Sequence, residues 1–320
     1  MTVDIIIPVY KPGEEFATLL TKLHQMSDHI GKVILANTEK PYWEQFEREH
    51  PKESCYPELS VFHVTAQEFD HGGTRREAIE RSKAKVFVCM TQDAVPADTE
   101  LIENLVKALE AKADIAAAYA RQLPKADAGV IECYTRAFNY PETGYVRYAK
   151  DLSTHGIKTF FCSNVCAAYK RSVYDEMGGF ATQAIFNEDM IYAGNCIRKG
   201  YGIAYAADAR VYHSHQYSGR QQYHRNFDLG VSQAEHPEVF EGVPSESEGK
   251  KLVKQTAAYL VKKGKGYLIP KLIWQSGCKY LGYRAGKGYQ RSSHKSILKK
   301  TGNKAYFQRK WEKEKTVCAE

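Results

Sequence analysis

The chain has 320 residues, of which 43% are hydrophobic and 26% are charged, and this ordinary globular composition excludes a chain that is disordered throughout. No run approaches the roughly 18 consecutive apolar residues that a membrane-spanning helix needs. The net charge of +7 is unevenly distributed. The first 240 residues hold 26 Lys and Arg against 32 Asp and Glu, whereas residues 241–320 hold 19 against 6. We therefore expect the two parts to have different tasks.

The beginning of the chain and its cysteines both bear on location. The first residues lack the basic segment and the apolar run of a signal peptide, so we expect the chain to remain where it is made. Eight cysteines are scattered without a CxxC pair. This pattern favours reduced thiols in a cytosol over a disulfide framework or a zinc site.

The first 120 residues alternate between short apolar runs and segments with helical periodicity. Apolar runs predict strands at Asp4–Val9, Lys32–Ala36, Ser60–Val64, Lys85–Met90 and Ile115–Ala120. Apolar residues at helical spacing predict helices over Phe16–Leu23 and Leu101–Leu109. This alternation predicts an α/β fold with a mostly parallel sheet. Ligands of such sheets bind at the carboxyl ends of the strands.

Beyond residue 120 the pattern is less regular. A late strand is predicted near Tyr205–Tyr212. Basic, helical segments follow at Lys250–Lys263 and Tyr267–Tyr283, and the final stretch, Arg291–Lys315, is mostly Lys, Ser and Gln.

Two candidate ligand-binding segments lie in the first half of the chain. Asp93 follows an apolar strand, a place where a lone Asp is more often a turn or helix cap than a ligand. Phe69–Arg76 combines a glycine pair with cationic side chains at the start of a helix, and such donors suit a diphosphate. A glycine turn with solvated arginines is the alternative.

Two further candidates lie in the second half. Glu188 and Asp189 are adjacent, so they do not share a helical face, and one can point into a cleft while the other braces a neighbour. A helix capped by Asn187, with both acids in its first turn, is the alternative. His213 and His215 alternate at the end of a strand. Two such histidines are weak evidence for a metal without a further ligand.

These candidate segments follow one another along the chain in an order that resembles the order in a family 2 glycosyltransferase of the GT-A fold. More narrowly, the chain is similar to the bacterial rhamnosyltransferases that extend cell-wall or O-antigen polysaccharides. The resemblance spans residues 3–230 and is carried by Phe69–Arg75, Thr91–Ala94, Arg121–Pro124, Phe138–Pro141, Ser163–Asn164, Asn187–Asp189 and His213–His215. It implies a catalytic domain over 1–240, Rossmann-like with a mostly parallel sheet and flanking helices, followed by a basic, mostly helical region over 241–320.

The resemblance also implies roles for individual residues. The donor dTDP-β-L-rhamnose would be bound by Pro8, Val9, Tyr10, Asn37, His71, Gly73, Arg75, Thr91, Gln92 and Asp93. Asp93 and His213 would hold a divalent metal, Mn²⁺ or Mg²⁺, although Thr91 replaces the first acid of the family's Asp-X-Asp motif. Asp189 would be the catalytic base, with Glu188 beside it. The acceptor side would include Arg121, Ser163, Asn164 and His215.

The implied reaction is inverting transfer of L-rhamnose to a sugar hydroxyl of a lipid-linked cell-surface polysaccharide. Alternatives are a UDP- or GDP-sugar donor, a scaffold that binds nucleotide sugars without catalysis, and a protein that binds nucleic acid through its basic tail. We expect the tail to meet an anionic membrane surface, which would place the protein in the cytoplasm, peripheral on the inner face of the bacterial membrane. A helical appendage that packs on the catalytic domain or on a second copy is the other interpretation.

Overall fold

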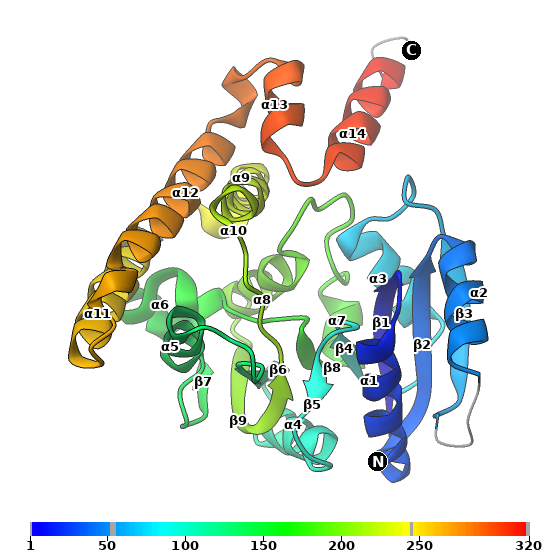
Figure 1. The fold of residues 1–320 in the computed structure, drawn as a ribbon. Helices are drawn as coiled ribbons and strands as arrows, with labels where there is room; N and C mark the ends of the chain where they lie inside the picture. Colours follow the sequence, from blue (N-terminus) through cyan, green and yellow to red (C-terminus); the bar gives the residue numbers. More distant parts are fainter. Residues whose placement is uncertain (1, 52–55, 244–245, 318–320) are drawn as a thin grey trace.

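A computed structural model describes residues 2–51, 56–243 and 246–317, and within them the strands form one sheet (Figure 1). The strands are β1 (Val3–Tyr10), β2 (Ile30–Thr38), β3 (Leu59–Val64), β4 (Val86–Met90), β5 (Val95–Pro96), β6 (Ile115–Leu123), β7 (Tyr145–Arg147), β8 (Cys166–Lys170) and β9 (Gly202–Tyr212). The strand order is β3-β2-β1-β4-β8-β6-β9-β5, with β7 also paired to β9. β3, β2, β1, β4, β6 and β9 run in one direction, while β8, β5 and β7 run against their neighbours.

Helices cover both faces of the sheet because its strands are apolar on both faces. In β1, Val3, Ile5 and Ile7 pack into one hydrophobic cluster and Ile6 into another. The first cluster is completed by α1 (Glu14–His24), α2 (Lys40–Glu49) and α4 (Leu101–Glu110). The second is completed by α3 (His71–Glu80), α7 (Arg171–Glu176) and α8 (Glu188–Arg198). Strands buried on two faces explain the continuous apolar runs that predict them.

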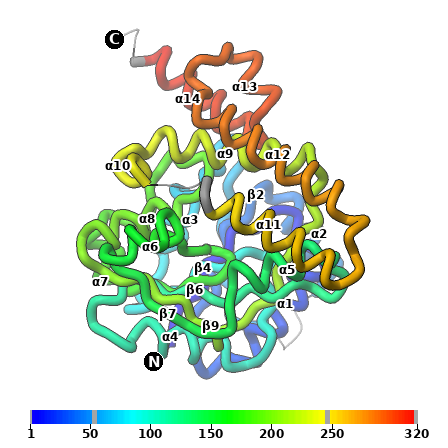
Figure 2. The backbone as a smooth tube through the Cα atoms, turned by 90° about the vertical axis from the view of Figure 1, so that its left-hand side faces the viewer, coloured from blue at the N-terminus to red at the C-terminus, as the bar shows by residue number. Residues whose placement is uncertain are grey.

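The remaining helices lie beside the sheet and, in the view of Figure 1, above it. They are α5 (Val130–Asn139), α6 (Leu152–His155), α9 (Gly219–Glu235), α10 (Pro237–Phe240), α11 (Glu246–Lys262), α12 (Ile269–Lys287), α13 (His294–Lys300) and α14 (Lys304–Val317). Figure 2 shows α11 and α12 lying across the outside of the molecule, with α13 and α14 above them. None of the helices in the described ranges is long and apolar enough to cross a membrane.

Helices α9 and α12 approach each other closely through glycine. A Cβ atom on Gly286 would lie 2.1 Å from the carbonyl oxygen of Phe227, and one on Gly282 would lie 2.3 Å from that of Tyr223. On the opposite helix, a Cβ on Gly230 would lie 2.4 Å from the carbonyl oxygen of Tyr283. Side chains at these three positions would force the two backbones apart.

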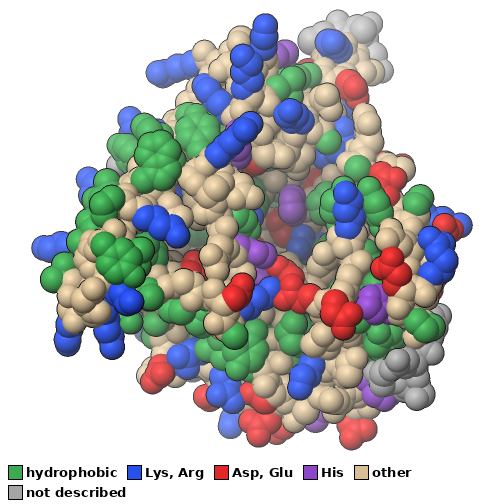
Figure 3. Space-filling view, viewed as in Figure 1, with side chains coloured by type: hydrophobic (Ala, Val, Ile, Leu, Met, Phe, Trp, Pro, Cys, Tyr) green, Lys and Arg blue, Asp and Glu red, His purple; other side chains and the backbone are tan. Residues whose placement is uncertain are grey.

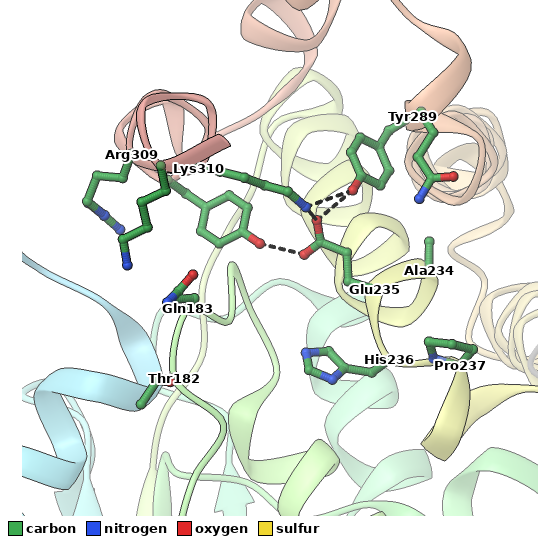
Figure 4. Close-up of a pocket in the computed structure, with 12 residues that line it drawn as sticks. Thr182, Gln183, Ala234, Glu235, His236, Pro237, Tyr289, Arg309 and Lys310 are labelled. Carbon is green, nitrogen blue, oxygen red and sulfur yellow. Dashed lines mark hydrogen bonds and ion pairs between the residues drawn. The ribbon is translucent and has the colours of Figure 1, made fainter. Parts of the chain in front are cut away.

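A carboxylate at the end of α9 anchors the last helices (Figure 4). Glu235 accepts hydrogen bonds from the hydroxyl groups of Tyr289, at 2.6 Å, and Tyr306, at 2.5 Å, and from the ammonium group of Lys310. A third hydrophobic cluster, which contains Phe227 and Phe307, lies in the same region.

The predicted α/β fold with a mostly parallel sheet and basic C-terminal helices is confirmed. Each predicted strand is present, with ends that differ by up to three residues. The irregular region over 121–235 contains elements that the pattern does not predict, among them α5, β7, β8 and α9. Helix α8 begins with both acids in its first turn, as the alternative interpretation of Glu188 and Asp189 expects. The boundary between 240 and 241 stays a prediction, and α9 and α12 pack together across it. The six described cysteines are free, as expected, while Cys55 and Cys318 lie outside the described residues.

Candidate active site

The carboxyl ends of β1, β2 and β4 meet at one edge of the sheet and bring the predicted donor residues together. Val9 is paired with Asn37 across β1 and β2. Gln92, just after β4, clamps the end of β1: its Oε1 accepts from the Tyr10 N–H at 2.7 Å, and its Nε2 donates to the Tyr10 carbonyl at 2.9 Å. Gln92 thus fixes the end of β1, where Tyr10 is a predicted donor contact. Pro8, in β1, and Thr91, just after β4, lie at the same edge of the sheet.

Asn37 is fully buried at this edge. Its Nδ2 lies 3.1 Å from the carbonyl oxygen of Glu39 and 3.1 Å from Nδ1 of His63. Its Oδ1 has no hydrogen-bond partner among the described residues. A buried acceptor without a partner is costly, so this oxygen is suited to a donor group on a ligand.

The N-terminus of α3 is fixed by Asp70. Its Oδ1 accepts from the N–H groups of Gly72, at 3.0 Å, and Gly73, at 3.1 Å, and its Oδ2 accepts from the N–H of Gln183 at 2.6 Å. A Cβ on Gly72 would lie 1.8 Å from the carbonyl oxygen of Ala181, whereas one on Gly73 would make ordinary contacts at 3.5 Å. Close packing against the loop before α8 therefore requires glycine at position 72, and Gly73 stays a predicted donor contact.

A buried ion pair joins α3 to α8. Nη1 of Arg75 lies 2.9 Å from Oε1 of Glu188, and Nδ2 of Asn164 donates to the same oxygen at 3.0 Å. Arg75 also donates to the carbonyl oxygen of His71 at 3.0 Å. Burial opposes ionisation of Glu188, but Arg75, His71 and Asn164 together outweigh it and hold the pKa of this carboxyl below its usual value. Glu188 is thus an ionised, paired group, which suits a bracing role.

Asp189 has the opposite environment in the first turn of α8. Its Oδ2 accepts from the N–H of Asn164 at 2.8 Å, and its Oδ1 accepts from the N–H of Met190 at 2.7 Å. Burial and the neighbouring charge of Glu188 raise the pKa of Asp189 above its usual value. Asn187 stands before the helix in the left-handed region, with φ of 72°, and its side chain does not cap the helix.

Asp93 forms a cluster with the two histidines that follow β9. Its Oδ2 lies 3.5 Å from Nε2 of His213 and 3.1 Å from Nε2 of His215, and the two Nε2 atoms are 3.1 Å apart. Burial disfavours the charge on Asp93, but hydrogen bonds from both imidazoles outweigh it and hold its pKa well below the usual value. Burial also lowers the pKa of His213, which favours the neutral imidazole that a metal requires.

Gln122 fixes which nitrogen of His213 carries the proton. Arg136 can only donate, and its guanidinium group binds Oε1 of Gln122. Nε2 of Gln122 in turn donates to Oγ of Ser163 at 3.0 Å. Because Oε1 is an acceptor, Nδ1 of His213, at 3.1 Å from it, must donate. When His213 is neutral, the lone pair of its Nε2 is therefore available to a cation held together with Asp93, and only the protonated ring donates to Asp93.

The cluster fits a divalent cation. The ligand atoms of Asp93, His213 and His215 all lie within 4.8 Å of one another. Neighbouring ligands of an octahedral ion with bonds of about 2.1 Å are about 3.0 Å apart, close to the 3.1, 3.5 and 3.1 Å of this cluster. The sequence predicts the first two ligands, whereas His215, which it places on the acceptor side, lies with them.

A continuous chain of contacts joins this cluster to Asp189. His213 contacts Gln122, Gln122 binds Ser163, and the next residue, Asn164, donates to Asp189. Figure 3 shows a hollow between the C-terminal helices and the first half of the sheet, with histidine and acidic side chains inside it. The residues predicted from three distant segments thus belong to one connected network.

Gln122 and Arg136 are the residues that sequence reasoning misses. It selects Arg121 instead, whose Nη2 lies 3.3 Å from Oε1 of Glu142. Alternation along β6 places neighbouring side chains on opposite faces, so Arg121 and Gln122 cannot both face His213. Gln122 does lie within the quoted Arg121–Pro124 segment, whereas Arg136 carries no sequence signal beyond its charge.

Comparisons with known proteins agree with this geometry. The family model "Glycosyltransferase like family 2" matches residues 44–227. The O-antigen chain rhamnosyltransferase RfbN of Salmonella typhimurium is 36% identical over 294 residues, which cover 91% of each chain. The O-antigen chain rhamnosyltransferase WbaN of Salmonella anatum is 38% identical over 235 residues, 72% of this chain and 73% of that protein.

Solved structures share the fold at low identity. The mannosyltransferase PcManGT from Pyrobaculum calidifontis, in complex with GDP-Man and Mn²⁺, aligns with a TM-score of 0.54 and 15% identity over 95% of this chain and 84% of its own. S. aureus TarS 1–349, in complex with UDP-GlcNAc, aligns with a TM-score of 0.50 and 12% identity over 91% and 92%. With its matched family model and its relatives above 30% identity, the chain belongs to glycosyltransferase family 2 and has the GT-A-like fold of that family.

Proposed function

We propose that this glycosyltransferase moves L-rhamnose from dTDP-β-L-rhamnose to a sugar hydroxyl of a lipid-linked cell-surface polysaccharide, with inversion at the anomeric carbon. The contact chain between Asp189 and the Asp93–His213–His215 cluster carries this proposal, because it connects a basic carboxylate to a set of metal ligands. The relatives named as O-antigen chain rhamnosyltransferases support the choice of sugar and of polymer.

The donor would lie at the edge formed by β1, β2 and β4. Asp93, His213 and His215 would hold Mn²⁺ or Mg²⁺, which when bound neutralises charge on the leaving diphosphate. Asn37 would offer its unpaired buried oxygen to the nucleoside. His71, Gly73 and Arg75 stay predicted donor contacts at the start of α3, and Arg75 additionally holds Glu188 in place.

Asp189 would take the acceptor proton. As the acceptor oxygen forms its bond to C1 of rhamnose, the bond from C1 to the diphosphate oxygen breaks and dTDP leaves. The hydroxyl proton passes to the carboxylate of Asp189, whose raised pKa makes it a stronger base than an ordinary aspartate. Attack opposite the leaving group converts the β-linked donor into an α-linked product.

The acceptor would approach from the side of α5 and α8, where Ser163 and Asn164 connect the two halves of the network. Arg121 stays a predicted acceptor contact. A lipid-linked acceptor would be met at the inner face of the cell membrane. Association into a homo-oligomer stays a prediction as well.

Ligand-induced thermal shifts test the donor. With Mn²⁺ or Mg²⁺ present, dTDP-L-rhamnose is expected to raise the melting temperature more than UDP- or GDP-sugars do. Asp93→Asn should lose the part of this shift that depends on metal, and Asp189→Asn should keep it. A larger shift with a UDP- or GDP-sugar would contradict the proposed donor.

A further inference from the structure

Exposed large hydrophobic side chains concentrate on one helical segment. Eight large hydrophobic residues are exposed in the described ranges, and six of them lie between residues 261 and 281. On α12 they are Ile273, Trp274, Tyr280 and Leu281, whose exposed fractions range from 48% to 68%. Just before α12, Tyr267 is 71% exposed. Isolated exposed apolar residues are ordinary, but such a concentration indicates a contact surface.

These residues share one side of α12. At 100° per residue, Ile273, Trp274, Tyr280 and Leu281 fall within about 120° of arc, opposite Gly282 and the rest of the side that packs on α9. We call these four side chains the α12 face. Figure 2 shows α11 and α12 on the outside of the molecule, and Figure 3 shows hydrophobic and basic side chains interspersed along the same edge.

Along the chain, the residues before and after the α12 face carry charge of one sign. Residues 249–311 contain 17 Lys and Arg and no Asp or Glu. Lys271 precedes and Lys287 follows the four residues of the α12 face along the helix, and both are exposed, as is Lys262 at the end of α11. Exposed Trp, Tyr and Leu flanked by lysines, without carboxylates, are complementary to a surface that is apolar inside and anionic outside.

The opposite side of α12 borders the active site. Nε2 of Gln275 donates to the carbonyl oxygen of Tyr217 at 3.1 Å, and Tyr217 is two residues beyond His215. At one border of the α12 face, the indole of Trp274 reaches the start of α9, because its Nε1 lies 2.4 Å from where a Cβ on Gly219 would stand. A surface that binds the α12 face would therefore lie close to the residues that follow the metal-binding cluster.

We propose that the α12 face docks on an anionic lipid membrane, with Trp274 and Leu281 in the interface and Lys262, Lys271 and Lys287 against the headgroups. The inference rests on the proposed function for its purpose, because docking would bring a lipid-linked acceptor to the site. Binding is measured without donor or acceptor, so its failure is distinguishable from failure of the proposed reaction.

Co-sedimentation of the full chain with lipid vesicles tests the charge requirement. Partitioning onto vesicles with 30% phosphatidylglycerol should exceed partitioning onto pure phosphatidylcholine by at least tenfold and should fall as salt rises. Each lysine near an anionic surface contributes about fivefold, so the triple variant K262E/K271E/K287E should bind at least about 100-fold more weakly. The matched variant K32E/K83E/K107E reverses three exposed lysines on the sheet half and should bind like the unaltered protein.

Tryptophan fluorescence tests the position of the α12 face. Trp43 is buried and Trp311 stacks on His294 at 3.7 Å between ring centres, whereas Trp274 is 68% exposed. Anionic vesicles should shift the emission to shorter wavelength. Trp274→Phe should abolish that shift and keep binding, and Trp274→Ser with Leu281→Ser should lower binding by at least tenfold. The proposal would be overturned if the protein bound neutral and anionic vesicles equally, or if both lysine variants lost the same amount of binding. An emission shift that survived Trp274→Phe would overturn it as well. A dimer that the Ser substitutions dissociate, without lipid binding, would overturn it in favour of contact between two copies.

Discussion

Two aspartates in one connected site have opposite environments. At the ends of β4 and β9, Asp93 faces the imidazoles of His213 and His215, whose hydrogen bonds outweigh its burial and hold its pKa low. At the start of α8, burial and the charge of Glu188 raise the pKa of Asp189. Groups whose environments separate their pKa values in this way divide the chemistry between them. Asp93 is suited to hold a cation, and Asp189 is suited to accept a proton.

Asp189→Asn should have the largest effect on turnover, because it removes the proposed base and leaves the proposed cation site in place. Removal of a general base costs about 100- to 10,000-fold in rate, so turnover should fall by that amount while donor affinity stays unchanged. Steady-state kinetics with an equilibrium binding measurement of the donor separate the two effects. Asp175→Asn alters a carboxylate on α7, outside the network, and should leave both unchanged. Near-normal turnover of Asp189→Asn would remove it from the role of base.

The buried ion pair beside Asp189 should govern stability. Arg75→Met leaves Glu188 buried and unpaired, which should lower the free energy of unfolding by about 3–5 kcal/mol. Urea unfolding measures this loss, and Arg75→Met combined with Glu188→Gln should recover part of it. Arg76→Met loses a single hydrogen bond, to the carbonyl of Phe180 at 3.2 Å, and should cost only about 1 kcal/mol. Equal costs for the two arginines would contradict the pairing.

Gln122, whose side chain accepts a hydrogen bond from Nδ1 of His213, should affect how tightly the cluster binds a metal. Gln122→Ala removes the acceptor that orients the imidazole, and loss of such a partner costs about 10- to 100-fold in metal affinity. Titration of the protein with Mn²⁺ measures the change. Arg121→Ala, on the neighbouring residue that faces Glu142, should leave metal affinity unaltered. If both variants bound Mn²⁺ like the unaltered protein, the orienting role of Gln122 would be excluded.

The smallest expected effect is a shift in the pH profile. Because a base must be deprotonated, kcat/KM should fall on the acid side through the raised pKa of Asp189, at a higher pH than the ordinary value of about 3.9 implies. Glu188→Gln removes a like charge, so it should move this acid limb to lower pH. An acid limb that stayed in place or moved to higher pH would show that another group controls it.

Sequence reasoning predicts the first half of the fold because its strands are continuous apolar runs. It misses β8, whose five residues include two alanines and no β-branched residue. It offers α8 only as an alternative, from Asn187 and the two acids that follow, because that helix is buried on most sides and therefore shows no single apolar stripe. Periodicity detects elements that face water on one side, and α8 does not.

The candidate site divides in a similar way. Motif order predicts Asp93, Asp189 and His213, since each follows or begins a recognisable segment. The orientation of Gln122 depends on contacts with Arg136 and Ser163, which are 14 and 41 residues away in the chain. The assignment of His215 to the cluster likewise depends on the direction of its ring. Residue types alone cannot predict either, because both are set by partners that only folding brings near.

Anomalous diffraction from crystals grown with Mn²⁺ and dTDP tests the central claim, that these segments form one metal-dependent transfer site. One Mn²⁺ peak should lie within bonding distance of Asp93, His213 and His215, with the dTDP phosphates on it and the carboxylate of Asp189 open to the same cavity. Bound dTDP with Mn²⁺ held elsewhere, or with Asp189 facing away from it, would contradict the account.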